Sequence, residues 1–390
     1  MPQSSAQFDI VVVGAGLVGA AFALALRDSG LRVAVVEPSP PASETDAWDG
    51  RIYALNPANV EFLSRLGVWP DLDPGRIQAV DRMEIYGDEG AHLEFCAYDA
   101  GVLALAYILE SGRLQNALWR GLQRAPNVEL IVGARCAAAD FGQGEARLGL
   151  DDGRTLRAAL LVGADGANSW VRQAAGLHAD VYRYETQGVV ANFECERSHD
   201  GVAFQWFRTD GVLAYLPLPG RRMSMVWSTP NAHAEELLRL PPEQLAARVA
   251  EAGQGVLGRL QVITPPQAFP LRKIRVPDIV APGVALIGDA AHVVHPLAGQ
   301  GVNLGFGDAM VLARLIAERE PYRGCGDPVL LRRYRRERAE PVAAMRLVTH
   351  GLERLFATRS RWLRTLRNRG LALTDRVVPV KNLLIRHAIG

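Results

Sequence analysis

The chain has 390 residues, 49% of them hydrophobic, and a formal net charge of +1. This length allows two or three domains with a sizeable core, and the near-neutral charge gives no reason to expect a nucleic-acid partner. The four cysteines form no CxxC pair, which argues against a zinc site or a disulfide framework and fits a reducing, cytoplasmic environment. The apolar run at residues 10–26 lacks a basic leader, so we interpret it as core, and no other run is long enough to span a bilayer.

A dinucleotide-binding pattern lies near the N-terminus. The run FDIVVV at residues 8–13 predicts a buried parallel strand, and the hexapeptide GAGLVG follows it directly. We expect an alanine-rich helix over residues 20–28 and a second strand over residues 31–36. GxGxxG binds a dinucleotide in this context, with an acid about 20 residues further on to hold ribose hydroxyls. The residues that form the pattern are Gly14, Gly16, Gly19 and Glu37.

Residues 38–157 predict a mixture of loops, strands and helices. Residues 38–49 are rich in Pro, Ser and Asp, which predicts a mobile loop. A helical stretch is expected to end near residue 69, and residues 77–95 predict strands outside the nucleotide domain. Residues 106–122 predict an amphipathic helix, and residues 128–132 another strand of the parallel sheet. Residues 137–157 predict a β-meander with a turn at DDGR.

The middle of the chain changes from a nucleotide-domain pattern to a β-rich one. A strand at residues 160–163 precedes DGANSWVR, which predicts an acid–glycine turn at Asp165 and a helix with Ser169 in its first turn. Short β-rich runs at residues 189–194, 202–208, 212–216 and 223–227 are separated by turn residues and predict an antiparallel sheet. Residues 234–252 are expected to be helical.

The stretch VALIGDAAHVVHPLAGQGVNLGFGD at residues 284–308 carries the strongest ligand signal. A buried strand at residues 284–287 ends at Gly288 and Asp289, and open α/β sheets bind ligands at this end of their strands. Four glycines follow, three of them in the first turns of a predicted helix, where amide N–H groups favour negative charge. An acid followed by a glycine-lined helix start suits a flavin. His292 and His295 form HxxH, but no third ligand lies nearby in the sequence, so we expect no metal.

GDAAH followed by HPLAGQGVNLGFGD resembles the signature of the ubiquinone-biosynthesis hydroxylases within the group A flavoprotein monooxygenases, and GxGxxG and DGxxSxxR precede it in the family's order. The resemblance implies an α/β fold: a Rossmann-type FAD-binding domain with an inserted antiparallel-sheet substrate domain, as in p-hydroxybenzoate hydroxylase, and a helical C-terminus. We expect the FAD-binding domain at residues 1–70, 100–176 and 280–320, and the substrate domain at 71–99 and 177–279. A helical basic region is expected over residues 321–390.

The resemblance also implies non-covalent FAD, electrons from NAD(P)H or another donor, and O2. In the family, an arginine of a segment similar to DGRIYAL lies along FAD, and an arginine and a glutamine of the helix expected at 106–122 contact it. Family relatives present a prolyl carbonyl over the ring, and backbone amides are expected to stabilise reduced flavin. The cofactor-binding residues implied beyond the first motif are Arg51, Arg113, Gln115, Asp165, Gly288, Asp289, Gly301, Val302 and Asn303. The implied catalytic residues are Pro296, Gly299, Gln300 and Gly301.

The implied reaction is hydroxylation of a polyprenylated phenol or hydroquinone through a C4a-hydroperoxyflavin. Two alternatives stay open: a hydroxylase of a small soluble phenol, and an FAD-binding scaffold in a quinone-biosynthesis complex. The run LLRRYRRER at residues 330–338 is expected to be mainly a solvated face. Residues 351–390 hold nine Lys or Arg against two acids among apolar residues, which suits either the anionic inner membrane surface or packing onto the domain. A lipid carrier could otherwise deliver the substrate.

Overall fold

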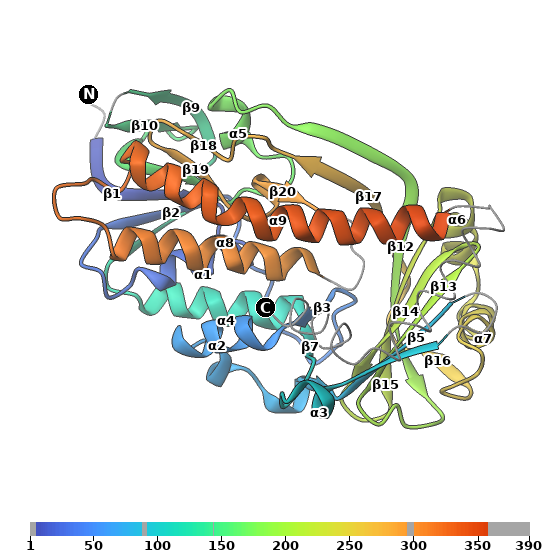
Figure 1. The fold of residues 1–390 in the computed structure, drawn as a ribbon. Helices are drawn as coiled ribbons and strands as arrows, with labels where there is room; N and C mark the ends of the chain where they lie inside the picture. The colour runs from blue at the N-terminus through green and yellow to red at the C-terminus, as the bar shows by residue number, and fades with distance from the viewer. Residues whose placement is uncertain (1–4, 88–91, 143, 295–299, 358–390) are drawn as a thin grey trace.

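The computed structural model describes the chain except for residues 1–4, 88–91, 143, 295–299 and 358–390 (Figure 1). A mostly parallel sheet with helices around it forms one half of the molecule. A large, mostly antiparallel sheet forms the other, and the long strands β12 (Asp180–Cys195) and β17 (Gln267–Arg275) run between the halves. The mixed α/β architecture predicted from the sequence is confirmed. The expected domain boundaries stay a prediction.

The parallel sheet has β1 near its centre, between β11 and β2, and all three strands run in the same direction. Its central strands are continuous apolar runs, as expected for strands buried on both faces. The sheet has eight strands in the order β18-β19-β11-β1-β2-β8, and β10 and β9 extend it from β11. The bounds are β1 Ser5–Val13, β2 Val33–Glu37, β8 Val128–Val132, β9 Cys136–Phe141, β10 Ala146–Leu150, β11 Thr155–Gly163, β18 Val280–Ala281 and β19 Val284–Leu286.

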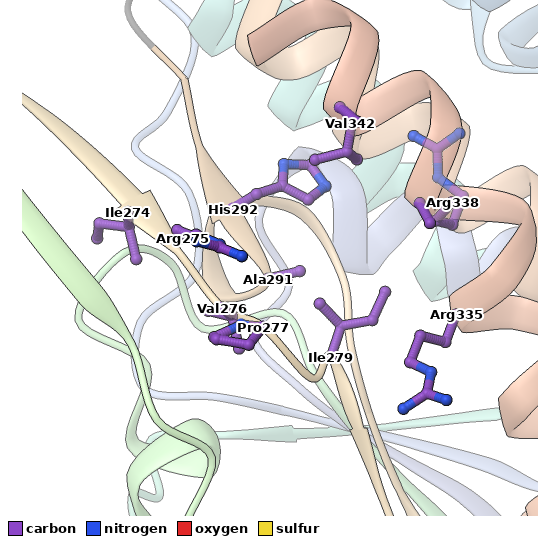
Figure 2. Close-up of a pocket in the computed structure, with 12 residues that line it drawn as sticks. Ile274, Arg275, Val276, Pro277, Ile279, Ala291, His292, Arg335, Arg338 and Val342 are labelled. Carbon is purple, nitrogen blue, oxygen red and sulfur yellow. The ribbon is translucent and has the colours of Figure 1, made fainter. Parts of the chain in front are cut away.

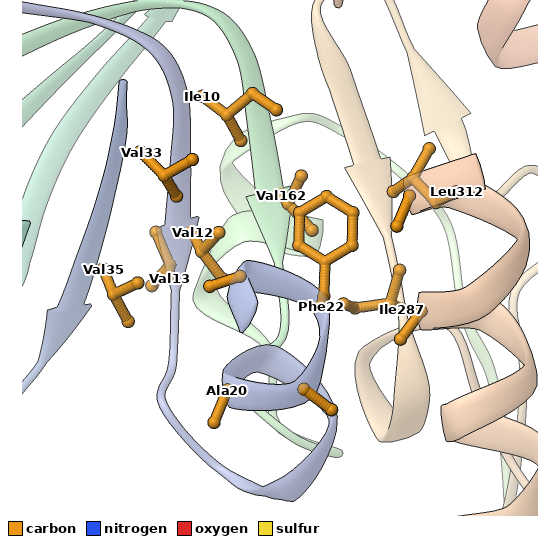
Figure 3. Close-up of a cluster of buried hydrophobic side chains, with 14 of the residues drawn as sticks. Ile10, Val12, Val13, Ala20, Phe22, Val33, Val35, Val162, Ile287 and Leu312 are labelled. Atoms are coloured by element: carbon orange, nitrogen blue, oxygen red, sulfur yellow. The ribbon is translucent and has the colours of Figure 1, made fainter. Parts of the chain in front are cut away.

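Helices α1 (Leu17–Ala25) and α8 (Gln300–Ala317) pack side by side and cover one face of this sheet (Figure 3). Phe22 of α1 and Leu312 of α8 are fully buried, and they meet Ile287 at the end of β19. The two segments that carry the glycine motifs are therefore fixed in one core although almost 300 residues separate them. Other helices of this half are α2 Pro57–Arg65, α4 Ser111–Arg124, α5 Trp170–Ala174 and the short turns Trp69–Asp71 and Pro74–Arg76.

The antiparallel sheet confirms the β-rich reading of residues 189–227. It has nine strands in the order β20-β17-β12-β15-β14-β13-β5-β6, with β16 paired to β12. One face packs on α6 (Asn231–Arg239) and α7 (Pro242–Ala252) through Trp227, Tyr215 and Phe193. The strands are β5 Arg82–Tyr86, β6 His92–Cys96, β12 Asp180–Cys195, β13 Val202–Arg208, β14 Gly211–Leu218, β15 Arg222–Pro230, β16 Leu260–Val262, β17 Gln267–Arg275 and β20 His292–Val293.

Two predicted helices were partly wrong. The helix expected over residues 106–122 begins only at Ser111, because residues 106–110 form β7 between β3 (Ile52–Leu55) and β4 (Gln78–Val80) in a three-stranded sheet. The helix expected over residues 234–252 is interrupted at Leu240 and Pro241. Consecutive prolines at 241 and 242 disfavour the helical conformation of the residues before them, so the chain restarts as α7.

The C-terminal helix α9 spans Pro328–Ala357, runs beside α8 (Figure 1) and passes the end of β17. Leu330 and Tyr334 of this helix are buried against the parallel sheet, and the Tyr334 hydroxyl donates to the Leu286 carbonyl at 2.8 Å. Among the helices of the described chain, none combines the length and apolarity that crossing a membrane requires. Most of the basic region at residues 351–390 lies outside the described residues, so its packing or membrane role stays a prediction.

Candidate active site

The GxGxxG turn joins β1 to α1 and has the geometry of a phosphate-binding loop. Gly14 has φ +100°, and a Cβ there would lie 2.5 Å from the Ala164 carbonyl oxygen. A Cβ at Gly19 would lie 2.1 Å from the Gly14 oxygen, so this glycine permits close packing of the helix on the turn. Gly16 is different, because a Cβ there would meet no atom within 4 Å. The first and third glycines are required by the protein itself, whereas the second leaves its backbone open to a ligand.

Two side chains hold this turn from either side. The Glu37 carboxylate accepts the Ala15 amide at 2.8 Å through Oε2, and its Oε1 accepts the Ser39 amide at 3.2 Å. Gln115 of α4 donates to the Ala15 carbonyl at 2.5 Å. The structure therefore brings two predicted cofactor residues to the phosphate-binding loop. Glu37 stands at the end of β2, as the dinucleotide pattern requires.

The loop at residues 38–49 was predicted to be mobile, and this prediction was wrong for its second half. Residues 42–49, here called the strap, are fastened to α4 and β7. Glu110 is 1% exposed and accepts the Asp49 amide at 2.8 Å together with two bonds from Arg76, at 2.7 and 2.8 Å. The Arg76 guanidinium also lies 3.8 Å from the centre of the Trp48 ring. The partners that fix the strap are distant in sequence, so composition alone indicated a free loop.

Arg113 is largely occupied by the strap. It donates to Glu110 at 3.1 Å and to the Thr45 carbonyl at 3.2 Å, and its ion pair with Glu44 spans 3.5 Å. Arg51, in contrast, is exposed, and its guanidinium lies 5.1 Å from the centre of the Phe269 ring. Of the two arginines predicted to contact FAD, Arg113 is thus held by protein carboxylates, whereas Arg51 is exposed beside an aromatic ring.

Asp165 acts on its own helix. Its Oδ2 accepts the Trp170 and Val171 amides at 2.7 and 3.0 Å at the start of α5, while Ser169 caps the same helix by accepting the Arg172 amide. Gly14 approaches it closely, because a Cβ at Gly14 would lie 3.1 Å from the Asp165 Cα. Asp165 therefore shapes the floor under the phosphate-binding loop.

Asp289 lies in a one-turn helix, Gly288–Ala290, directly after β19. Gly288 has φ +60°, which lets the chain turn sharply where the strand ends. The Asp289 side chain is exposed, yet the surrounding protein desolvates its carboxyl and raises its pKa, opposed by His292, Arg272 and Arg51. A carboxylate that is accessible to solvent but largely surrounded by protein lies in a concave part of the surface. Burial also raises the pKa of Tyr53, which interacts with Arg51 and Asp289 and was not predicted from the sequence.

The glycines of α8 divide into two groups. A Cβ at Gly301 would meet nothing within 4 Å, so its backbone is open, and Val302 beside it is 9% exposed. A Cβ at Gly305 would lie 2.6 Å from a methyl of Val18, and one at Gly307 would lie 3.0 Å from the Arg338 guanidinium. The expectation that the glycines at the helix start suit a flavin was therefore wrong for Gly305 and Gly307. They admit neighbouring helices instead.

Asn303 is anchored to β3 and α2. Its Nδ2 donates to the Ala54 carbonyl at 2.8 Å, and its Oδ1 accepts from the Asn59 side chain at 2.8 Å and the Asn56 amide at 3.0 Å. With the side chain occupied in this way, only its main chain is left for a cofactor. Gln300 begins α8. Pro296 and Gly299 lie outside the described residues.

A buried group of three charged or titratable residues lies behind the concave surface at Asp289. His292, Asp308 and Arg338 are between 0 and 6% exposed, and both His292 and Arg338 hydrogen-bond to Asp308. Residues 330–338 were expected to be mainly solvated, and this was wrong for Arg338. The missed signal was the spacing, because Leu330, Tyr334 and Arg338 are four residues apart and share one helix face. Among the described residues, no group of three potential ligands could hold a metal ion.

These residues fit FAD. The backbone at Gly16 is open, Glu37 ends the second strand, and the open backbone at Gly301 lies on α8, which is packed against α1. Ala15, Glu37 and Asp289 lie at or just after the carboxyl ends of β1, β2 and β19, where open α/β sheets bind ligands, and together with Gly16 and Gly301 they are here called the cradle.

The comparisons agree with this geometry. A family model described as an FAD binding domain matches residues 7–349. The chain is 35% identical over 388 residues to the 3-demethoxyubiquinol 3-hydroxylase of Escherichia coli K12, covering 98% of each chain. It is 34% identical to the mitochondrial ubiquinone biosynthesis monooxygenase of Drosophila melanogaster, covering 99% of this chain and 91% of the relative.

Among solved structures, PqsL of Pseudomonas aeruginosa, a probable FAD-dependent monooxygenase, matches with a TM-score of 0.76. The sequence identity is 25%, and the match covers 94% of this chain and 100% of PqsL. The sequence motifs, the cradle and these full-length matches agree: the chain belongs to the ubiquinone-biosynthesis hydroxylase family and is an FAD-dependent aromatic-ring monooxygenase.

Proposed function

We propose that this protein hydroxylates the aromatic ring of a polyprenylated phenol or hydroquinone in ubiquinone biosynthesis. The observation that carries the proposal is the match to 3-demethoxyubiquinol 3-hydroxylase, which extends over 98% of both chains. A match of this extent includes the antiparallel sheet as well as the nucleotide-binding half. The proposal therefore concerns the substrate and not only the cofactor.

In this proposal the protein holds FAD through the cradle described above. Glu37 accepts ribose hydroxyls, the Ala15–Gly16 backbone faces the pyrophosphate, and Asp289 binds polar groups further along the cofactor. Backbone amides at Gly301 and Val302 stabilise the negative charge of the reduced ring, as donors in an oxyanion hole do. When bound, FAD reduced by NAD(P)H or another donor supplies the O2 chemistry. The predicted contributions of Pro296 and Gly299 belong to the same proposal.

The face of the antiparallel sheet opposite α6 and α7 is apolar. Its strands alternate, so that Trp227 and Tyr215 face α6 and α7 whereas Leu216 and Leu218 face the three-stranded sheet. There they pack with Ile52 and other apolar side chains of β3 and β7, and Leu218 is fully buried. In this proposal the ring lies beside this packed apolar layer, which favours an uncharged aromatic substrate and excludes water from it.

The membrane part of the proposal rests on substrate and charge. A polyprenylated ring partitions into the bilayer, so the protein has to meet it at the surface or receive it from a carrier. Each basic residue near an anionic surface contributes about 1 kcal/mol, and residues 351–390 hold nine against two acids. We expect co-sedimentation with anionic liposomes at low salt and partial release at high salt. Glu in place of Arg361, Arg364 and Arg367 should reduce binding and leave the flavin spectrum intact. Equal binding to neutral liposomes would contradict the electrostatic mechanism.

The decisive experiment supplies the purified holoenzyme with NAD(P)H, 18O2 and either a prenylated phenol or its unprenylated ring. Mass spectrometry should show one 18O atom in the prenylated product. If the unprenylated ring is hydroxylated at least as efficiently, the protein is a hydroxylase of small soluble phenols. Deletion of the gene gives a second readout, because the quinone precursor that accumulates identifies the step. Absence of any hydroxylated product with either ring would support the FAD-binding scaffold instead.

A further inference from the structure

One buried carboxylate collects three donors from separate parts of the chain. Asp308 of α8 is 0% exposed. Its Oδ1 accepts the Arg338 Nε of α9 at 2.6 Å, and its Oδ2 accepts the His292 ring Nε2 at 2.7 Å and the Gly288 amide at 2.9 Å. The donors thus come from α9 and from both sides of Asp289. All the donors converge on a residue that FAD is not proposed to touch.

The neighbouring residues of α8 leave room for the buried Arg338 side chain. The Arg338 guanidinium lies flat against Gly307, where a Cβ would be 3.0 Å from Nη2, and Nη2 also donates to the Leu304 carbonyl at 3.0 Å. Buried ion pairs are a poor source of net stability, because desolvation of both charges offsets their attraction. A buried group with every partner in place does, however, fix the positions of the segments that carry it.

The segment that this group fixes is the turn carrying Asp289. Gly288 immediately precedes Asp289 and His292 follows three residues later, so Asp308 holds the turn from both sides. We propose that Asp308, His292 and Arg338 form a clamp that positions the Asp289 carboxylate for FAD. The clamp rests on the proposed contact between Asp289 and FAD, and it makes α9 part of the cofactor site although no residue of α9 touches the cradle in this scheme.

Figure 2 shows two of the three clamp residues, His292 and Arg338. His292 and Arg338 line a pocket of about 160 Å³ between β17, β20 and α9, and Arg335 lies at its edge. Arg275 of β17 also lines the pocket, and the remaining lining residues shown, such as Ile279 and Val342, are apolar. Arg335 is a matched control for Arg338, because it lies on the same helix and pairs with Asp278 at an exposed site.

The test measures the Kd of FAD for the deflavinated protein by fluorescence titration, in a double-mutant cycle. Arg338→Met should raise the Kd about tenfold, which corresponds to the loss of one hydrogen bond between a misplaced Asp289 and FAD. Arg335→Met should leave the Kd unchanged. In an Asp289→Ala background, Arg338→Met should add nothing, because its effect acts through Asp289. The same fold-change in both backgrounds would overturn the clamp. If Arg338 contributes only to stability, Arg338→Met should lower the unfolding temperature, and its effect on the Kd should not depend on Asp289.

A second pair of variants covers the case in which Arg338→Met does not fold. His292→Leu removes the donor to Asp308, whereas His292→Gln keeps one, so the Kd should rise in the first and be largely restored in the second. Equal Kd values in both would contradict the clamp. The readout needs no substrate, so it is independent of whether a prenylated ring is hydroxylated. If Asp289→Ala alone leaves the Kd unchanged, the proposed FAD contact of Asp289 fails, and the clamp fails with it.

Discussion

Replacement of Glu110 with glutamine tests whether the strap is held as tightly as its contacts indicate. The glutamine has the same shape but no charge, and its amide nitrogen cannot accept from the guanidinium of Arg76 or Arg113. The side chains of these arginines are only 14% and 18% exposed, so they would lose a charged partner in a poorly solvated place. Breaking a buried pair by removing one partner costs about 3–5 kcal/mol. Because the glutamine keeps one acceptor oxygen and both arginines retain backbone partners, we expect about 3 kcal/mol.

Two measurements check this prediction. Urea unfolding monitored by tryptophan fluorescence gives the loss of stability, and subtilisin digestion followed by mass spectrometry reports cleavage within residues 38–49. Glu44→Gln is the matched control, because Glu44 also pairs with Arg113, and with Arg120, but is more exposed than Glu110, and an exposed ion pair contributes about 0–1 kcal/mol. If Glu110→Gln costs no more than the control, or if the strap is cleaved no faster, the strap is not held by the Glu110 carboxylate.

Three further predictions use single sites. Gly301→Ala should leave apoprotein stability unchanged and weaken FAD binding. Gly305→Ala should lower the unfolding temperature, because its Cβ would lie 2.6 Å from a methyl of Val18. Equal thermal shifts in the two variants would contradict the assignment of Gly301 to the cradle. Glu37→Ala should raise the Kd of FAD about tenfold through loss of hydrogen bonds to a charged acceptor, and an unchanged titration would refute the ribose contact. Desolvation opposes ionisation of Asp308, but His292 and Arg338 outweigh it and hold its pKa below the usual value. Its stabilisation is therefore present above about pH 4 and lost as pH falls through the lowered pKa, so the stability difference between wild type and Asp308→Asn should shrink in acid; a difference independent of pH would contradict this.

The parts of the fold that sequence predicts well are those with local causes. The apolar strand of residues 8–13, the glycine turn after it and Glu37 follow one another directly, and each restricts the backbone without help from distant residues. The same holds for the GDAAH turn after β19. The break at Pro241 and Pro242 was also readable from local chemistry, because proline cannot continue a helix from the preceding turn.

The errors arose where distant partners decide the outcome. Residues 106–110 are compatible with helix or strand, and only pairing with β3 and β4 makes them a strand. The strap has a loop-like composition, and its order depends on Arg76 and Glu110. Asp308 could not be singled out from sequence because its importance lies in three donors from elsewhere in the chain.

The discontinuous parallel sheet has a consequence for synthesis on the ribosome. The outer edge of β11 receives its parallel neighbour, β19, only when residues 284–286 have emerged, and the covering helix α8 follows later still. The antiparallel sheet, apart from its two-residue edge strand β20, is complete by residue 275. The antiparallel sheet is therefore complete before the parallel sheet, and until then the nascent nucleotide half exposes β11 and the apolar face of α1 that includes Phe22. Premature termination before residue 284 should yield an aggregation-prone fragment with a folded sheet at its end.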